Sequence, residues 1–176
     1  MLLDRPDINE DLAGEMVKLH RSLQHLIRLN KTLLLLSRIE NDQFPPTDEV
    51  DMTSILRAAL EMNEEIYSHK SMNSSIEVRE SFVCRINEQV ASVLVGNLVK
   101  NAFVHSPAGG TIDIAISHGR FSVSNNGDGV LDKARLFDRF YTSGKTGSTG
   151  LGLALVKSIA GYYDFGIEYA FVDGKH

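Results

Sequence analysis

The apolar residues between positions 9 and 43 recur in alternating steps of four and three, which is the repeat of an α-helix that packs in a bundle. The positions in this repeat are Leu19, Leu23, Leu26, Asn30, Leu33 and Ser37. The residues that widen the apolar stripe beyond a two-stranded seam are Ile27, Leu29, Leu34 and Leu36. A lone helix cannot keep so much apolar surface in water, so we expect it to pack against partner helices. Because the chain has one such helix, the pattern predicts a homodimer through it.

Both ends of this first helix can be predicted. Asp7 or Asn9 is placed to cap its N-terminus. Pro45 and Pro46 end it, because proline cannot continue a helix and biases Phe44 away from helical dihedral angles. We therefore expect two domains, a helical part at residues 1–44 and a second domain at residues 45–176.

The pattern after residue 50 mixes two periods. Helical periodicity marks residues 51–70, residues 87–106 with Asn87 as cap, and residues 148–163. Alternation of apolar and polar residues predicts strands at 74–80, 81–87, 110–117, 120–125 and 165–172. Antiparallel hairpins mixed with helices predict an α+β fold, with helices on one face of a sheet.

Composition narrows the function classes. The chain has 176 residues, 43% of them apolar, which is enough to bury a core. Its net charge of -5 argues against nucleic acid as a partner. The single cysteine excludes a disulfide framework and a clustered-cysteine metal site. The longest apolar run, "TLLLLS", is too short to cross a membrane, so we expect a soluble portion that lies in the cytoplasm.

Three stretches have residue types that suit a ligand site. Asn97, Asn101 and His105 recur at every fourth position of one predicted helix, so they stack along one side of it. Carboxamide and imidazole groups in line suit a hard cation and a polar ligand, although solvated surface positions give the same spacing. Gly127 and Gly129 leave room for a planar group against the backbone, or form a plain turn.

The third stretch is the glycine-rich segment "GKTGSTGLGLAL" at residues 144–155. It leads directly into a helix, whose first turn has free N–H groups that can bind phosphate. Lys145 adds a cation to that site or is a solvated loop residue. Glycine-rich loops are common, so this stretch alone is weak support for a phosphate site.

In this order and spacing, the stretches resemble the ATP-binding catalytic domain of sensor histidine kinases of two-component systems. "NLVKNAFVHS" is similar to the N box of that family, "NNGDG" to its G1 box, "LFDRFY" to its F box and "STGLGLALV" to its G2 box. "RLNKTLLLLSRIENDQF" resembles the second helix of the dimerisation and phosphotransfer domain. The resemblance implies the Bergerat (GHKL) fold, a two-layer sandwich with a mixed, mainly antiparallel sheet, preceded by one long bundle helix.

The resemblance also implies roles for the N box and G1 box. It makes Asn101 the ligand of the Mg²⁺ ion that bridges the ATP phosphates, and Asn97 an ATP-binding residue that takes part in the transfer chemistry. His105 is expected beside the adenine. Asn125 is expected to face the adenine amino group, with Gly127 and Gly129 giving it room.

Further roles follow for the lid and the phosphate side. Tyr141, with Phe137 and Phe140, is expected to anchor the near end of an ATP lid at residues 142–149, which includes Lys145. The residues expected to close the phosphate side are Gly150, Leu151, Gly152 and Leu153.

The sequence departs from the family pattern at three points. Asn125 replaces the usual aspartate, which weakens a hydrogen bond to adenine by about 1 kcal/mol. Val104 stands where the family often has a lysine, so Lys145 or Lys100 is expected to contribute more charge near the phosphates. None of the six histidines has the acidic neighbour and proline of the family's phosphoacceptor.

The resemblance therefore implies the ATP-binding fragment of a longer histidine kinase anchored in the inner membrane through other segments. It implies transfer of the ATP γ-phosphoryl group to a histidine outside this sequence, with relay to an aspartate of a response-regulator receiver domain. Two alternatives stay open. One is a nucleotide-binding scaffold without phosphotransfer, and the other is a serine kinase of the anti-sigma-factor type. The long first helix argues against the serine kinase.

Overall fold

The computed structural model describes residues 10–127, 129–142 and 149–176. The described residues form four α-helices: α1 (Glu10–Glu40), α2 (Met52–Ile66), α3 (Glu88–His105) and α4 (Gly152–Tyr162). The strands are β1 (Asp48–Asp51), β2 (Asn73–Val78), β3 (Val83–Ile86), β4 (Thr111–Ser117) and β5 (Arg120–Asn125), and a short 3₁₀ helix, η1 (Ser68–Lys70), follows α2. This confirms an α+β fold that begins with a long helix.

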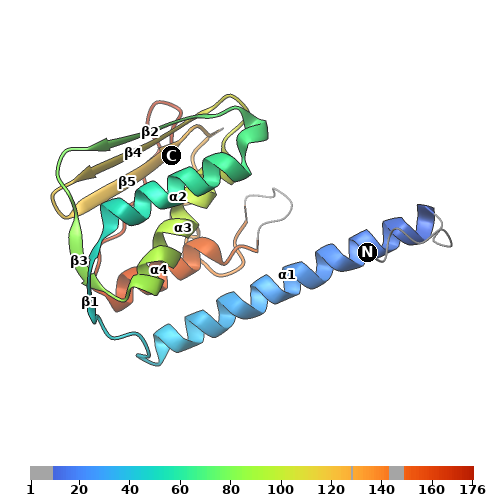
Figure 1. The fold of residues 1–176 in the computed structure, drawn as a ribbon, viewed down its shortest axis with the longest axis horizontal. Helices are drawn as coiled ribbons and strands as arrows, with labels where there is room; N and C mark the ends of the chain where they lie inside the picture. The colour runs from blue at the N-terminus through green and yellow to red at the C-terminus, as the bar shows by residue number, and fades with distance from the viewer. Residues whose placement is uncertain (1–9, 128, 143–148) are drawn as a thin grey trace.

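Two small sheets form one layer of the domain. The larger sheet has the order β2-β4-β5, with β2 parallel and β5 antiparallel to β4, and β1 pairs with β3 in an antiparallel ladder. Helices α2, α3 and α4 lie on one face of the larger sheet (Figure 1). Ile112, Ile114 and Ile116 alternate along β4 and are almost completely buried, because that strand turns one face to the helices.

Side-chain caps define where two of these helices begin. The Asp51 carboxylate accepts from Thr53 N at 2.9 Å and from Ser54 Oγ at 2.7 Å, and the pKa of Asp51 is lowered mainly by the Ser54 bond. Asn87 Oδ1 accepts from Val90 N at 3.2 Å, as predicted for the N-cap of α3. The predicted cap at Asp7 or Asn9 lies outside the described residues.

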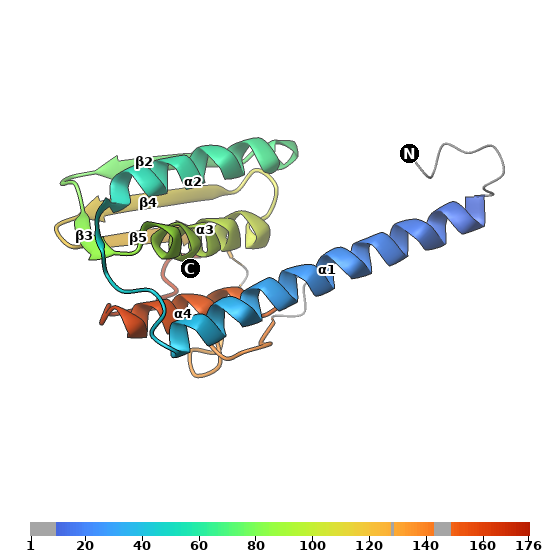
Figure 2. The same ribbon diagram turned by 60° about the horizontal axis from the view of Figure 1, so that its bottom comes forward.

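Helix α1 contacts the rest of the molecule only near its C-terminus, among the described residues (Figure 2). Leu36 and Ile39 are buried in the main core, and the Glu40 carboxylate pairs with the guanidinium of Arg139. The predicted seam leucines are all exposed, with Leu19 at 61%, Leu23 at 49%, Leu26 at 59% and Leu33 at 41%. The end of α1 is therefore part of the domain core, while most of its length projects away.

The predicted last strand, residues 165–172, is not a strand. These residues alternate between half-buried and exposed, as the apolar pattern indicated, yet among the described residues they form no ladder beyond a single bridge at their end. This bridge pairs Val172 with Lys175, and a second, outside this segment, pairs Asn126 with Lys175. The alternation fixed which side chains face inward, but a ladder also needs a neighbouring strand with free backbone groups.

Candidate functional site

Helix α3 brings the N box against the G2 box. Asn97 Nδ2 donates to the Val93 carbonyl one turn earlier at 2.8 Å, which fixes the orientation of the carboxamide. Its Oδ1 then lies 3.0 Å from the point where a Cβ on Gly152 would be. Glycine at 152 therefore lets the first residue of α4 lie against Asn97. The structure thus brings together two residues that are 55 positions apart in the sequence.

Asn101 and His105 follow Asn97 along α3, and both are half-buried. Within the described residues, the Asn101 carboxamide forms no side-chain hydrogen bond, so its oxygen can bind a ligand. His105 is the last residue of α3, and it is already engaged in an interaction within the protein. The carboxamide of Asn101 is thus available for binding, whereas that of Asn97 is fixed by its bond to Val93.

The F box and the G2 box meet at the base of the predicted lid. Phe140 N donates to the Gly150 carbonyl at 2.9 Å, and both residues have a positive φ, 65° in each case. A Cβ on Gly150 would lie 2.5 Å from the Phe140 carbonyl carbon, so only glycine fits there. Tyr141 is half-buried with the Arg135 guanidinium 5.1 Å from its ring centroid. The near end of the lid is therefore closed by backbone contacts, and Lys145 lies outside the described residues.

Helix α4 begins directly after this closure. Leu151 is completely buried, Leu153 is half-buried, and Leu155 N donates to the Leu151 carbonyl at 2.9 Å in the first helical turn. The backbone N–H groups that precede Leu155 in that turn have no intrahelical acceptor, as in any α-helix. These donors and the positive end of the helix dipole suit a phosphate group.

The end of β5 carries the G1 asparagines in two different roles. Asn126 Oδ1 accepts from Thr111 N at 2.5 Å and from Thr111 Oγ1 at 3.0 Å, so it joins β5 to the start of β4. Asn125 is only 9% exposed, and its Nδ2 donates to the Asn126 carbonyl at 2.9 Å. That bond orients the Asn125 amide so that Oδ1 is the atom able to accept from a ligand amine.

The space above Gly127 holds the imidazole of His176. A Cβ on Gly127 would lie only 1.8 Å from His176 Nε2. The imidazole is fixed by Tyr169, whose hydroxyl is 2.8 Å from His176 Nδ1, and by paired backbone bonds between Asn125 and His176. In the described structure the missing side chain at 127 therefore makes room for His176, where the sequence indicated room for adenine. Around Gly129, at φ 149°, there is open space.

The donor set fits a metal ion that arrives with a ligand. Among the described residues, no three His, Cys, Asp or Glu side chains group together as a metal site would require. Mg²⁺ in nucleotide sites is held by one or two protein oxygens, substrate phosphates and water. The free carboxamide oxygen of Asn101 matches this need, since it supplies one neutral oxygen and leaves the other positions to phosphate and water.

Two residues at this site were not singled out by the sequence. Asn126 fixes the G1 turn, and Lys70 lies at the end of α3, with its Nζ 2.7 Å from the Phe103 carbonyl. The "NN" pair was a visible signal, because two adjacent amides at a strand end can divide structural and binding roles. Lys70 gave no local signal, since it is a lysine at the end of an amphipathic stretch.

Known proteins with similar sequences include sensor histidine kinases. Residues 87–170 match the family model described as "Histidine kinase-, DNA gyrase B-, and HSP90-like ATPase". Sensor protein QseC of Escherichia coli (strain K12) is 31% identical over 164 residues, which cover 88% of this chain and 36% of that protein. Sensor-like histidine kinase SenX3 of Mycolicibacterium smegmatis is 29% identical, covering 94% of this chain and 45% of that protein.

Solved structures agree in fold. The Acinetobacter baumannii histidine kinase AdeS covers 96% of this chain and 82% of its own, with a TM-score of 0.71 at 21% identity. The cytoplasmic segment of histidine kinase QseC has a TM-score of 0.59 at 21% identity and covers 86% of this chain and 89% of its own. These findings show that the chain carries the ATP-binding catalytic domain of a sensor histidine kinase.

The chain spans 36–45% of the length of the curated relatives named above. Among the residues that the structure describes, no helix has both the length and the apolar character needed to cross a membrane.

Proposed function

We propose that this chain binds ATP with Mg²⁺ and is the catalytic module for transfer of the γ-phosphoryl group to a histidine on another segment or chain. The observation that carries the proposal is the contact of Asn97 with Gly152, which brings the N box to the start of α4. Asn101 lies one turn further along the same helix, and its carboxamide forms no side-chain hydrogen bond within the part of the chain that the structure describes. Helix dipole and carboxamide oxygens therefore converge where a triphosphate would bind.

Each group has a role that its geometry supports. Asn101 Oδ1 is the ligand for Mg²⁺, which neutralises charge on the phosphates when it is bound. The free N–H groups at the start of α4 donate to the phosphate oxygens, and Asn125 Oδ1 accepts from the adenine amine. Asn97, fixed by Val93, positions the terminal phosphate. Catalysis of this kind rests on positioning and charge stabilisation, because phosphoryl transfer needs little covalent chemistry from the protein.

The remaining parts of the proposal concern the longer protein. Residues 1–44 and 45–176 form the bundle part and the catalytic domain, and α1 pairs with a second copy of itself. The phosphorylated histidine passes its phosphoryl group to a receiver-domain aspartate of a response regulator. The protein is anchored in the inner membrane by other segments, with this part in the cytoplasm. Support comes from the exposed apolar face of α1 and from the sensor names of the relatives.

The first test is a calorimetric titration with the analogue AMPPNP, a probe chosen because the fold neighbour ShkA was solved in complex with it. We expect the wild-type chain to bind in a Mg²⁺-dependent manner. Asn101→Ala should weaken binding at least about tenfold, because it removes the one protein ligand for the ion. Ser92→Ala, an exposed change on the same helix, is the matched control. No binding at millimolar analogue would refute the proposal.

A second test separates the reaction classes. The chain is incubated with ATP and a supplied histidine-bearing helical hairpin of a sensor kinase, and acid-labile phosphohistidine is measured. Label on the hairpin histidine supports the proposal. Acid-stable phosphoserine on a partner would indicate the serine kinase, and binding without any label would indicate the scaffold.

A further inference from the structure

The short helix η1 contacts the end of α3, on which the N box lies. Lys70 Nζ lies 2.7 Å from the Phe103 carbonyl, 3.0 Å from that of Val104 and 2.9 Å from that of Ser106. The last carbonyls of an α-helix have no intrahelical donors, so they need partners from elsewhere. An ammonium has three N–H donors, and Lys70 directs them to three carbonyls at this helix end.

Charge strengthens this contact. The C-terminus of a helix has a partial negative charge, and a cation placed there is stabilising. Hydrogen bonds from an ammonium are also stronger than those between neutral groups. The Lys70 carbonyl in turn accepts from Gly109 N at 2.9 Å, in the turn that follows α3. Lys70 therefore ties down the helix end with its side chain and the next turn with its backbone.

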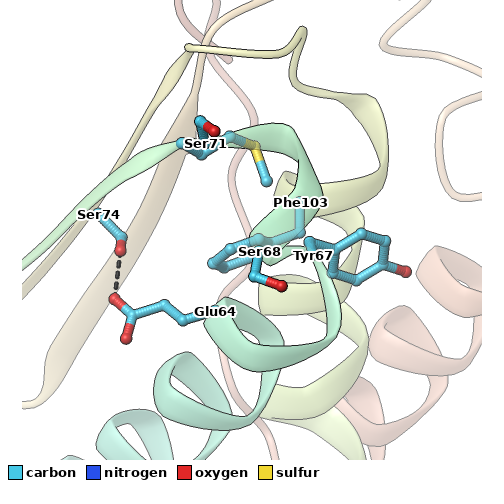
Figure 3. A pocket seen from close by; sticks show the side chains of 7 residues that line it. Glu64, Tyr67, Ser68, Ser71, Ser74 and Phe103 are labelled. Atoms are coloured by element: carbon cyan, nitrogen blue, oxygen red, sulfur yellow. Dashed lines mark hydrogen bonds between the residues drawn. The ribbon is translucent and has the colours of Figure 1, made fainter.

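Packing also holds this end of α3. Phe103 is 1% exposed and stacks on Tyr67 with ring centroids 5.7 Å apart, and a hollow of about 180 Å³ lies beside the two rings (Figure 3). The Glu64 carboxylate at its rim accepts from the Ser74 hydroxyl, so this charge is already engaged (Figure 3). The bonds from Lys70 add to this packing, because they hold backbone carbonyls that the apolar core cannot bond.

The anchored carbonyls lie between the residues of the candidate site. Phe103 and Val104 stand between Asn101 and His105, and Ser106 follows directly. We infer that Lys70 is a positioning residue for nucleotide binding, acting through the end of α3 on Asn101 and His105. This inference rests on the proposed function. It assigns a role to a lysine that is outside the four boxes and bonds the backbone carbonyls at the end of α3.

The test compares Lys70→Met, which keeps most of the unbranched side chain but removes its charge and donors, with Lys70→Arg, which keeps the charge and the donors. Lys157→Met, an exposed change on α4, is the control. AMPPNP affinity is measured by calorimetry with Mg²⁺, and amide hydrogen exchange is measured for residues 101–106 at a temperature where each variant is folded. We expect Lys70→Met to weaken binding roughly fivefold and to speed exchange at these amides. Lys70→Arg should restore most of both.

A purely structural lysine would lower the unfolding midpoint and leave the affinity of the folded protein unchanged, so that result would overturn the inference. The inference is also overturned if the wild-type chain binds the analogue and Lys70→Met shows unchanged affinity and unchanged amide exchange. In that case the proposed function still stands. No binding by the wild-type chain would refute the proposed function, and the positioning role with it. If Lys70→Met does not fold, Lys70→Gln takes its place, because it keeps donors without the charge. Its analogue affinity and its amide exchange at residues 101–106 then test the inference.

Discussion

At the scale of single residues, Asn125 has a structural contact in addition to its proposed contact with the ligand. Its amide nitrogen bonds the Asn126 carbonyl, and it is almost completely buried. An aspartate at position 125 would have a carboxylate oxygen in place of the donor Nδ2. Its negative charge would then face the Asn126 carbonyl oxygen. The family's usual aspartate would therefore strengthen the bond to adenine but weaken this local contact.

We predict opposite effects of Asn125→Asp on affinity and stability. ATP analogues should bind several-fold more tightly, because the carboxylate accepts from the adenine amine with about 1 kcal/mol more free energy. The free energy of unfolding of the ligand-free chain should fall by about 1–3 kcal/mol, because the donor to the Asn126 carbonyl is lost. Calorimetry and denaturant unfolding measure the two effects.

Asn126→Asp is the matched control for this pair. Asn126 Oδ1 accepts both of its bonds from Thr111, and a carboxylate oxygen can accept them equally well. Its affinity for the analogue should therefore stay near the wild-type value. An Asn125→Asp variant that binds no more tightly than wild type would show that Asn125 does not face the adenine.

At the scale of elements, the C-terminal segment is tied to the central sheet by charge. Lys175 Nζ lies 2.6 Å from an Asp113 carboxylate oxygen, and Ser75 Oγ donates to the other at 2.8 Å. These bonds, Lys175 first, hold the pKa of Asp113 below its usual 3.8. A lowered pKa stabilises the folded state above the unfolded pKa, and this stabilisation is lost as the pH falls through the folded value.

Lys175→Met should therefore lower the free energy of unfolding at pH 7, and the difference from wild type should shrink at acid pH, as the pH falls below 3.8 through the lowered pKa of Asp113. The Asp113 side chain is 44% exposed, so solvent screening keeps the effect below about 1 kcal/mol. Urea unfolding at pH 7 and at acid pH measures it. Lys18→Met, which breaks a fully solvated pair on α1, should show almost no change at either pH. A difference that persists at low pH would show that Lys175 acts by packing.

Periodicity predicted the elements that have a strong pattern of their own. The strand at residues 110–117 and the cap at Asn87 follow from local alternation and local hydrogen bonding, and both are present. β1 was not predicted, because its four residues contain one apolar side chain and pair only through β3. The His176 contact with Gly127 joins residues 49 positions apart, and no local pattern carries such a contact.

For the candidate site too, the local patterns were predictable from the sequence, whereas the contacts between distant residues were not. The spacing of Asn97, Asn101 and His105 on one helix was visible in the sequence, as was the glycine-rich entry to α4. No local pattern indicated that Gly152 is needed because Asn97 lies against it, or that Gly150 is needed because of the Phe140 backbone. These glycines serve close contacts within the protein as well as any ligand.

At the scale of the whole molecule, α1 joins a compact domain to a projecting apolar face. The Tyr163 hydroxyl donates to the Phe44 carbonyl at 2.7 Å and accepts from Asn87 N at 3.3 Å. The linker after α1 and the N-cap of α3 therefore share one side chain. Together with Leu36 and Ile39 in the core, this contact couples the base of α1 to the helix that carries the N box.

The exposed leucines of α1 predict a dimer that does not depend on nucleotide. Burying a leucine side chain contributes about 1.5–3 kcal/mol to the free energy of association, and in a two-fold interface each substitution is present in both copies of the chain. Leu26→Glu should therefore raise the dimer dissociation constant on the order of 100-fold, as measured by analytical ultracentrifugation. Met62→Glu, an equally exposed apolar position on α2, should leave it unchanged. A wild-type chain that stays monomeric at several hundred micromolar would show that α1 does not self-associate and needs a different partner helix for its apolar face.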